Sequence, residues 1–336
     1  MKRIISIWIL AIVSLGAMAQ EKRMAVVEFS TSYLRLKPDY EAPLETQELM
    51  GTVVEIVGEQ SYWREVITPQ PYRAWCTDQG LVEMTAEQLK AYEEAPKVMF
   101  NELYGHIYME PSIDAATICD LVGGDLLRLA EISGNEANTA KAVQKALKGK
   151  WTNVMLPSGK TGYVPSKELK PHTGFKSIAM GEGSAESISP ETTEDIIAQA
   201  EKLLGVPYLW GGMSAKGVDC SGMVRIAHIM NGILLPRNAS QQVKCGERVE
   251  ICREEGKNQY GREEAMEAVK NLQRGDLVFF GTPATDEKPM RITHVGIYLG
   301  DNKIIHSSHR VRINSLIPGD ADYYENAHRL VAAISL

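Results

Sequence analysis

The chain has 336 residues, a net charge of −7 and 44% hydrophobic residues. This length suits two or three domains of about 100–200 residues each, and the apolar content is ample for packed cores. The acidic balance, with no basic cluster beyond the N-terminus, argues against nucleic acid as a partner. Five cysteines are an odd count, so at least one thiol is free or paired between molecules.

The N-terminus has the pattern of a secretory signal peptide. A basic start at residues 1–3 precedes an almost entirely apolar run at 4–15, and small residues then lead to Ala19. This pattern predicts cleavage after Ala19, and the run is shorter than the ~20 residues that a membrane-spanning helix needs. We therefore expect residues 1–19 to be removed, no membrane span in the mature chain, and a periplasmic or secreted location.

Residues 24–170 contain a diverged repeat. Each copy has a proline after a strand-like stretch, then a glycine turn, then a tryptophan followed three residues later by valine; these positions are Pro38, Gly51, Trp63 and Val66 in the first copy and Pro111, Gly123, Trp151 and Val154 in the second. Short alternating strands broken by Gly and Pro predict two small β-barrels. The motif order resembles the bacterial SH3 domain at 24–90 and again at 98–170, with an insertion at 135–150.

The chain changes character after the second barrel. Residues 171–190 carry Gly, Ser and Pro without apolar periodicity and are interpreted as a linker. The segment 191–336 begins with helical patterns, one of them starting near Cys220 and ending at Gly232. Predicted strands then follow at 276–280, 291–299, 303–307 and 330–336. Helices followed by an antiparallel sheet indicate an α+β domain.

Cys220 is a candidate nucleophile. It follows Asp219 at the predicted start of a helix, where the positive end of the helix dipole lowers the pKa of a thiol. The thiolate is the reactive form of cysteine. The tetrapeptide alone is equally compatible with a small buried apolar residue.

Two histidines strengthen the case for catalysis. Alternation along 291–299 puts His294 on one face of a strand, and residues 300–302 are a hairpin turn signal. A three-residue loop would place Ser308 opposite His294 and bring His306 onto the same face, diagonal to His294. One histidine could then act as the base for the thiol while the second orients it.

Other interpretations of these residues stay open. Two histidines in a hairpin can simply lie on the surface. Cys220, His294 and His306 could also hold zinc, but no two of them have the compact spacing of a typical ligand pair, so we expect no metal and no cofactor.

Five motifs in order resemble the NlpC/P60 peptidases over about 145 residues. They are 208–212 (YLWGG), 219–222 (DCSG), 235–242 (LPRNASQQ), 275–280 (GDLVFF) and 293–300 (THVGIYLG), with His306 after them. The resemblance implies a papain-like α+β catalytic domain, preceded here by the two all-β SH3-like barrels, that hydrolyses peptidoglycan stem peptides. It assigns Cys220 as nucleophile, His294 as base, His306 as orienting residue and Tyr208 as a group near the oxyanion.

Within that family, two SH3 modules before the peptidase resemble the YkfC-type γ-D-glutamyl-L-diamino acid endopeptidases, also called dipeptidyl-peptidase VI. Those enzymes act on peptides with a free N-terminal L-alanine. The resemblance implies that Glu45 and Tyr72 of the first barrel face the substrate amine, and that further residues line the pocket: Trp210, Asp219, Ser221, Asn238 and Ala239. This chain has Asn238 where YkfC-type sequences have aspartate, so residue 238 alone cannot neutralise an ammonium. Glu45 could also be a solvated loop acid.

Two other function classes fit parts of the sequence. One is a wall-binding protein whose SH3 modules grip intact peptidoglycan, and the other is a papain-like acyltransferase. The charged segment 243–270 is longer than expected for the family, and its Cys245 and Cys252 could form a local disulfide in an oxidising compartment.

Overall fold

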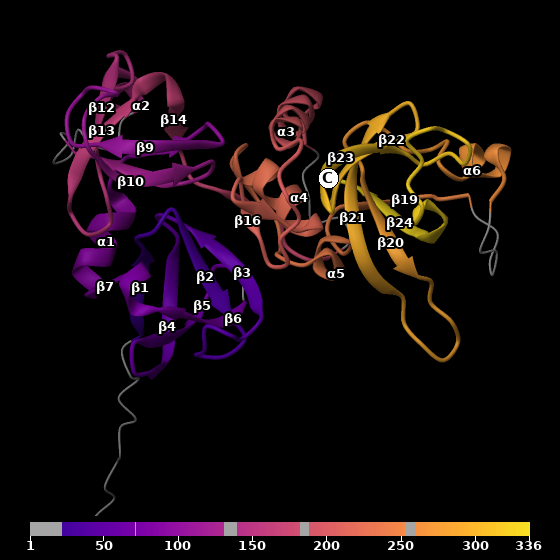
Figure 1. Cartoon of the computed structure of the whole chain (residues 1–336), viewed down its shortest axis with the longest axis horizontal. Helices are drawn as coiled ribbons and strands as arrows, with labels where there is room; N and C mark the ends of the chain where they lie inside the picture. Colours follow the sequence, from indigo (N-terminus) through magenta and orange to yellow (C-terminus); the bar gives the residue numbers. More distant parts are fainter. Residues whose placement is uncertain (1–21, 71, 131–139, 182–187, 253–259) are drawn as a thin grey trace, which may run out of the picture.

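A computed structural model describes residues 22–70, 72–130, 140–181, 188–252 and 260–336. The predicted signal peptide lies outside them. Two β-barrels occupy one end of the molecule and a third sheet occupies the other, with helices α3 (Pro190–Lys202) and α4 (Cys220–Ile229) between them (Figure 1). No described helix has the length and apolarity to cross a membrane.

The first barrel is a seven-stranded antiparallel sheet in the order β3-β2-β6-β5-β4-β1-β7. Its strands are β1 (Arg23–Val27), β2 (Thr31–Arg35), β3 (Leu44–Leu49), β4 (Val53–Gln60), β5 (Trp63–Ile67), β6 (Arg73–Thr77) and β7 (Leu81–Met84), with a 3-10 turn η1 (Asp78–Gly80) before β7. Alternate residues such as Val54 and Ile56 on β4 point into its core. Helix α1 (Ala86–Glu94) leads to the second barrel and begins with a capping box at Thr85.

The second barrel repeats the first. Its strand order, β10-β9-β13-β12-β11-β8-β14, is the first order with every strand number raised by seven. The elements are β8 (Lys97–Phe100), β9 (Tyr104–Tyr108), β10 (Thr117–Val122), β11 (Leu126–Leu129), α2 (Ala140–Ala146), β12 (Trp151–Met155), β13 (Thr161–Pro165), η2 (Ser166–Glu168) and β14 (Leu169–His172). The two barrels predicted from the repeat are confirmed. Helix α2 lies within the predicted insertion.

The C-terminal domain packs helices against a six-stranded antiparallel sheet, β19-β24-β20-β21-β22-β23. Its elements are α3, α4, β15 (Lys176–Ser177), β16 (Met213–Ser214), β17 (Gly217–Val218), β18 (Ile233–Leu234), α5 (Ala239–Gln242), β19 (Glu247–Val249), α6 (Arg262–Ala268), β20 (Leu277–Thr282), β21 (Arg291–Gly300), β22 (Lys303–Ser308), β23 (Arg310–Ser315), η3 (Ala327–Arg329) and β24 (Leu330–Ser335). The predicted α+β class, with two barrels before it, is confirmed.

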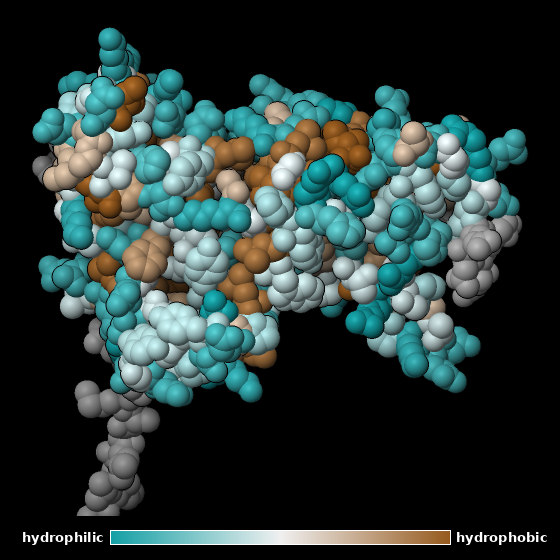
Figure 2. All heavy atoms as spheres, in the orientation of Figure 1, coloured by the Kyte–Doolittle hydropathy of each residue, from teal (hydrophilic) through white to brown (hydrophobic). Residues whose placement is uncertain are grey.

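The two faces of the C-terminal sheet have separate cores. Val295, Ile297 and Ile305 face α3 and α4, whereas Phe280 and Ile304 pack on the other face beside α6. Every residue of α4 is buried, including the polar Ser221, Arg225 and His228. On the face shown in Figure 2, hydrophobic side chains gather over the middle of the molecule, between the barrels and this sheet.

Several local expectations need correction. The β21–β22 hairpin has a two-residue turn at Asp301 and Asn302, both at positive φ, with Gly300 paired to Lys303 rather than lying in the loop. Strand β23, the edge strand that follows His309 at φ 63°, is not among the predicted strands. Cys245 and Cys252 do not form the disulfide considered above, because all five cysteines lie in the described ranges as free thiols.

Part of the segment 171–190, which was expected to be a linker, packs on the C-terminal domain. Lys176 and Ser177 form β15, which pairs in parallel with β18 of the C-terminal domain. Ile178 is fully buried in the core beside α3 and α4. The connection between the second barrel and the C-terminal domain is therefore partly built into the latter.

Candidate active site

Cys220 is the first residue of α4, as predicted. Asp219 is the N-cap, in extended conformation, and its Oδ1 accepts the backbone N–H of Gly222 at 2.7 Å. The sulfur therefore lies at the positive end of a ten-residue helix. A Cβ on Gly222 would lie 2.1 Å from the carbonyl oxygen of Gly212, so only glycine lets the 208–212 loop pack this closely on the helix.

A chain of three side chains runs from the base into the sheet. His294 on β21 lies with Nε2 2.7 Å from Nδ1 of His306 on β22, and Nε2 of His306 lies 2.9 Å from Oδ1 of Asn314 on β23. His306 is fully buried. The predicted shared face of the two histidines is confirmed by this contact. Asn314 was missed because its strand was missed.

Burial keeps the thiol and the histidines neutral at rest. It raises the pKa of Cys220 to about 12, with Asp219 adding to the rise, while hydrogen bonds from the backbone of Val295 and Ser221 oppose it. Burial also lowers the pKa of His294 to about 3, and the nearby His306 lowers it further. With the pKa of the thiol raised and that of the imidazole lowered, both groups are neutral near pH 7 in the absence of substrate.

Aromatic rings hold the two imidazoles in place. Tyr324 contacts His306 edge-on at 4.5 Å between ring centroids and His294 at 5.6 Å, and Phe280 lies 5.8 Å from His294. Burial is the main cause that raises the pKa of Tyr324, and Cys220 also contributes to the rise. Tyr324 therefore belongs to the surroundings of the thiol, although no sequence motif singled it out.

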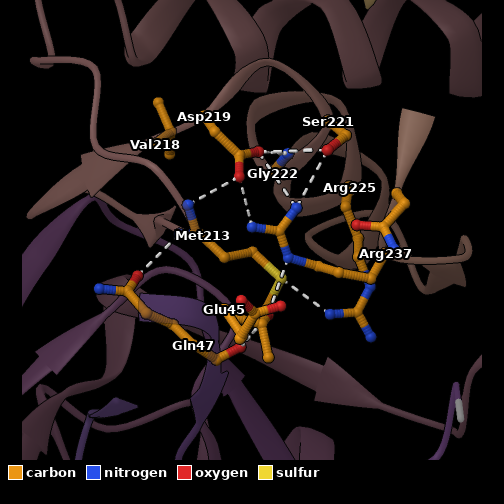
Figure 3. Close-up of polar contacts among 12 residues, drawn as sticks. Glu45, Gln47, Met213, Val218, Asp219, Ser221, Gly222, Arg225 and Arg237 are labelled. Carbon is orange, nitrogen blue, oxygen red and sulfur yellow. Dashed lines mark hydrogen bonds and ion pairs between the residues drawn. The ribbon is translucent and has the colours of Figure 1, made fainter. Parts of the chain in front are cut away.

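Arg237 links the nucleophile's helix to its surroundings (Figure 3). Its Nη2 lies 2.6 Å from Oδ2 of Asp219, and its Nη1 contacts Oδ1 of Asp219 at 3.1 Å and the Ser221 hydroxyl at 3.0 Å. Burial alone would lower the pKa of Arg237, but Asp219 raises it, so the guanidinium stays charged. Asp219 also accepts the backbone N–H of Gly211 at 3.0 Å. The Asp219 carboxylate thus joins the 208–212 loop to the start of α4.

Strand β3 of the first barrel reaches this cluster. Thr46 accepts a hydrogen bond from Arg237 Nε at 2.8 Å, and Gln47 accepts the backbone N–H of Met213 at 2.7 Å. The next residue, Glu48, is buried 3.8 Å from the guanidinium of Arg225 on α4. Three consecutive barrel residues therefore contact the C-terminal domain beneath the nucleophile, as Figure 3 shows for the labelled Gln47.

The same strand carries Glu45, which contacts Tyr72 and, through Tyr72, is linked to Asn238. The Tyr72 hydroxyl donates to Oε2 of Glu45 at 2.6 Å, and the Asn238 side chain also hydrogen-bonds Tyr72. Burial, then Glu45, raises the pKa of Tyr72 to about 12, so the phenol stays protonated. A Cβ on Gly211, at φ 75°, would lie about 3 Å from the backbone of Leu44 and Glu45, so the barrel strand packs directly on the active-site loop.

The remaining predicted residues lie around this cluster. Ala239, on the first turn of α5, is 9% exposed, and the Ser221 hydroxyl is held between Arg237 and Asp219. Trp210 is 66% exposed, so it is not a core residue and is free to form a wall. Tyr208 is held on the sheet's edge by its backbone N–H, which donates to the His309 carbonyl at 2.9 Å.

Two further features bear on the chemistry. Within the described ranges, no three His, Cys, Asp or Glu side chains are placed to hold a metal ion. A cavity of about 920 Å³ lies at the junction of the two barrels and α4, where it is lined by Leu126, His172 and Ile229. It is separate from the candidate catalytic residues.

The chain is similar to known proteins over most of its length. Residues 205–328 match the model of the NlpC/P60 family. Over 318 residues, covering 92% of this chain and 98% of the relative, the sequence is 27% identical to a dipeptidyl-peptidase 6 from Lysinibacillus sphaericus. It is 28% identical to a gamma-D-glutamyl-L-lysine dipeptidyl-peptidase from Bacillus subtilis, covering 79% of this chain and 72% of that protein. A crystal structure of an NlpC/P60 family protein from Bacillus cereus aligns over 93% of this chain and 98% of that one with a TM-score of 0.66 and 20% identity, which shows a shared fold.

Proposed function

Because its C-terminal domain is an NlpC/P60 cysteine peptidase domain, we propose that this chain cleaves the γ-D-Glu–L-diamino acid bond of murein peptides whose N-terminal L-alanine carries a free amine. The names of its relatives, a dipeptidyl-peptidase 6 and gamma-D-glutamyl-L-lysine dipeptidyl-peptidases, support a peptidoglycan peptide as substrate. The observation that carries the finer proposal is the Glu45–Tyr72–Asn238 cluster beside the loop that packs on the nucleophile's helix.

The proposed reaction uses the thiol and one histidine. The Cys220 thiol gives its proton to His294, and the thiolate attacks the γ-carbonyl of D-glutamate. The tetrahedral oxyanion is stabilised by the backbone N–H of Cys220 and by Tyr208. His294 returns the proton to the amine of the diamino acid, which leaves, and an acyl-enzyme remains. Water, deprotonated by His294, then releases the L-Ala-γ-D-Glu dipeptide and the free thiol.

The amine preference follows from charge. Glu45 supplies the negative charge that an alaninium needs, while Tyr72 and Asn238 supply neutral hydrogen-bonding groups. An acylated amine would bring no positive charge and would desolvate the carboxylate without a partner, which is a penalty against the wrong substrate. Because residue 238 is asparagine, Glu45 alone supplies the negative charge on which the proposed preference for a free amine depends.

The two rival functions receive less support. A barrel used to grip intact wall has no need of Thr46, Gln47 and Glu48 docked under the nucleophile, whereas a barrel that completes a substrate pocket does. An acyltransferase would require an amine acceptor, which would divert the acyl-enzyme from water. We also propose export of the mature chain, from the signal-like pattern of residues 1–19.

Mass spectrometry of digests of L-Ala-γ-D-Glu-meso-diaminopimelate tests the proposal. The wild type should release L-Ala-γ-D-Glu and the free diamino acid, with no new product when an amine acceptor is added. Cys220→Ala should release neither product while keeping the melting temperature of the parent. Dipeptide release by Cys220→Ala, or cleavage at another bond, would contradict the assignment.

A further inference from the structure

Asn314 closes the hydrogen-bond chain behind the two histidines. Its Nδ2 donates to the backbone carbonyl of Asp322 at 2.6 Å. A carbonyl oxygen can only accept, so this contact fixes the orientation of the amide. Oδ1 of Asn314 therefore faces His306, 2.9 Å from Nε2.

The fixed amide determines where each imidazole carries its proton. An amide oxygen accepts, so His306 must donate through Nε2–H. A neutral imidazole carries a single N–H, so Nδ1 of His306 is an acceptor. The 2.7 Å contact to this atom then requires His294 to donate through its own Nε2–H. Nδ1 of His294 is left with a free lone pair.

We propose that Asn314 is a positioning residue that sets the tautomer of both histidines, so that His294 presents an unprotonated Nδ1 to the Cys220 thiol. The inference rests on the proposed roles of Cys220 and His294. In the reaction a single proton moves, from Cys220 Sγ to His294 Nδ1, and the N–H bonds at both Nε2 atoms stay where they are. The wrong tautomer would place an N–H against the thiol and block the transfer.

A neutral amide at this position also controls charge. A carboxylate there would accept the same hydrogen bond but would stabilise an imidazolium at His306. That imidazolium would donate through Nδ1–H, forcing the proton of His294 onto Nδ1 and removing the base. Among the described residues, Arg312 acts on both imidazoles and Arg329 on His294, and both arginines disfavour an imidazolium. Tyr324 packs on both rings, and Cys220 in turn acts on Tyr324.

The sharpest test is the pH profile of Asn314→Asp. We expect kcat/KM at pH 6 to fall by about tenfold or more, and by no more than the 10²–10⁴ that a general base contributes. It should recover toward the wild-type value near pH 9, because His306 loses its extra proton there. The acid limb should move up by about one pH unit or more, as for a histidine gaining an opposite charge, while KM changes little. Asn302→Asp, the same change at the β21–β22 turn, should leave the profile in place.

A second measurement does not depend on the variant folding or on the substrate. Long-range ¹H–¹⁵N correlation spectra of the wild-type protein at pH 7 should show both His294 and His306 as the Nε2–H tautomer. An Nδ1–H tautomer at His294, or an Asn314→Asp profile superimposable on the wild type, would overturn the proposal. The spectra are recorded without substrate, so the tautomer result does not depend on the proposed peptide specificity. A failure of that specificity would be seen only in the digests.

Discussion

Tyr208 is the side chain that we propose assists the oxyanion. Its backbone bridges to Val218, the residue two before the nucleophile, and its ring is half-buried. Burial raises the pKa of its hydroxyl, and the charges of Cys220 and Asp219 raise it further. The phenol therefore stays protonated across the working range of pH and can donate to a developing negative charge.

Replacing Tyr208 with phenylalanine should remove a donor used in the transition state. We expect kcat to fall by roughly ten- to a thousand-fold, the range measured for loss of one oxyanion donor, with little change in KM. Steady-state kinetics on the tripeptide would check this. Tyr298→Phe, on β21 in the core near α6, is the matched control and should change stability rather than kcat. An unchanged kcat in Tyr208→Phe would remove Tyr208 from the mechanism.

At this scale the sequence predicted the reactive groups but not what holds them. Cys220, His294 and His306 were identifiable because a cap before a helix and a period-two strand pattern are local signals. Asn314 and Tyr324 come from segments whose path after His306 depends on a left-handed residue, His309, and no local pattern predicts that turn. Arg237 stood in a recognised motif, yet its partner Thr46 lies 191 residues earlier in the sequence.

Among the elements, β3 has two roles. Within the first barrel it is an edge strand paired only to β2, which leaves its other side free to meet the C-terminal domain. Its side chains then dock under α4 through Thr46, Gln47 and Glu48. The repeat predicted the strand itself, but the use of its free edge is a tertiary property that neither barrel sequence encodes alone.

Removing the Thr46 hydroxyl should weaken this docking. Thr46→Val keeps the shape but leaves Nε of Arg237 buried without its acceptor, at a cost of about 1–3 kcal/mol. We expect a lower urea midpoint and a lower kcat, because Arg237 also holds Asp219. Thr31→Val is the control in the same barrel, since the buried Thr31 hydroxyl has no hydrogen-bond partner among the described residues. That change should be neutral or stabilising. Equal effects of both substitutions would show that the Thr46–Arg237 contact has no special role.

At the scale of the whole molecule, the two barrels make different contacts. The first meets the C-terminal domain at the active site, and it joins the second through buried Asp125, whose carboxylate accepts the backbone N–H groups of Met50 and Val122. Domain order and fold class were predictable because repeats and ordered motifs survive divergence. The resemblance implied that the first barrel reaches the site, but the contacts that dock it were not predictable, since they join residues far apart in the chain.

We propose that the first barrel makes the site selective for a free amine. The direct measurement is kcat/KM for L-Ala-γ-D-Glu-meso-diaminopimelate against its N-acetylated form, for the wild type and for Glu45→Gln. The wild type should prefer the free peptide by roughly a hundredfold or more, as expected when the wrong substrate covers a charge and leaves it unpaired, and Glu45→Gln should lose most of that preference. Equal cleavage of the two peptides by the wild type would contradict the claim.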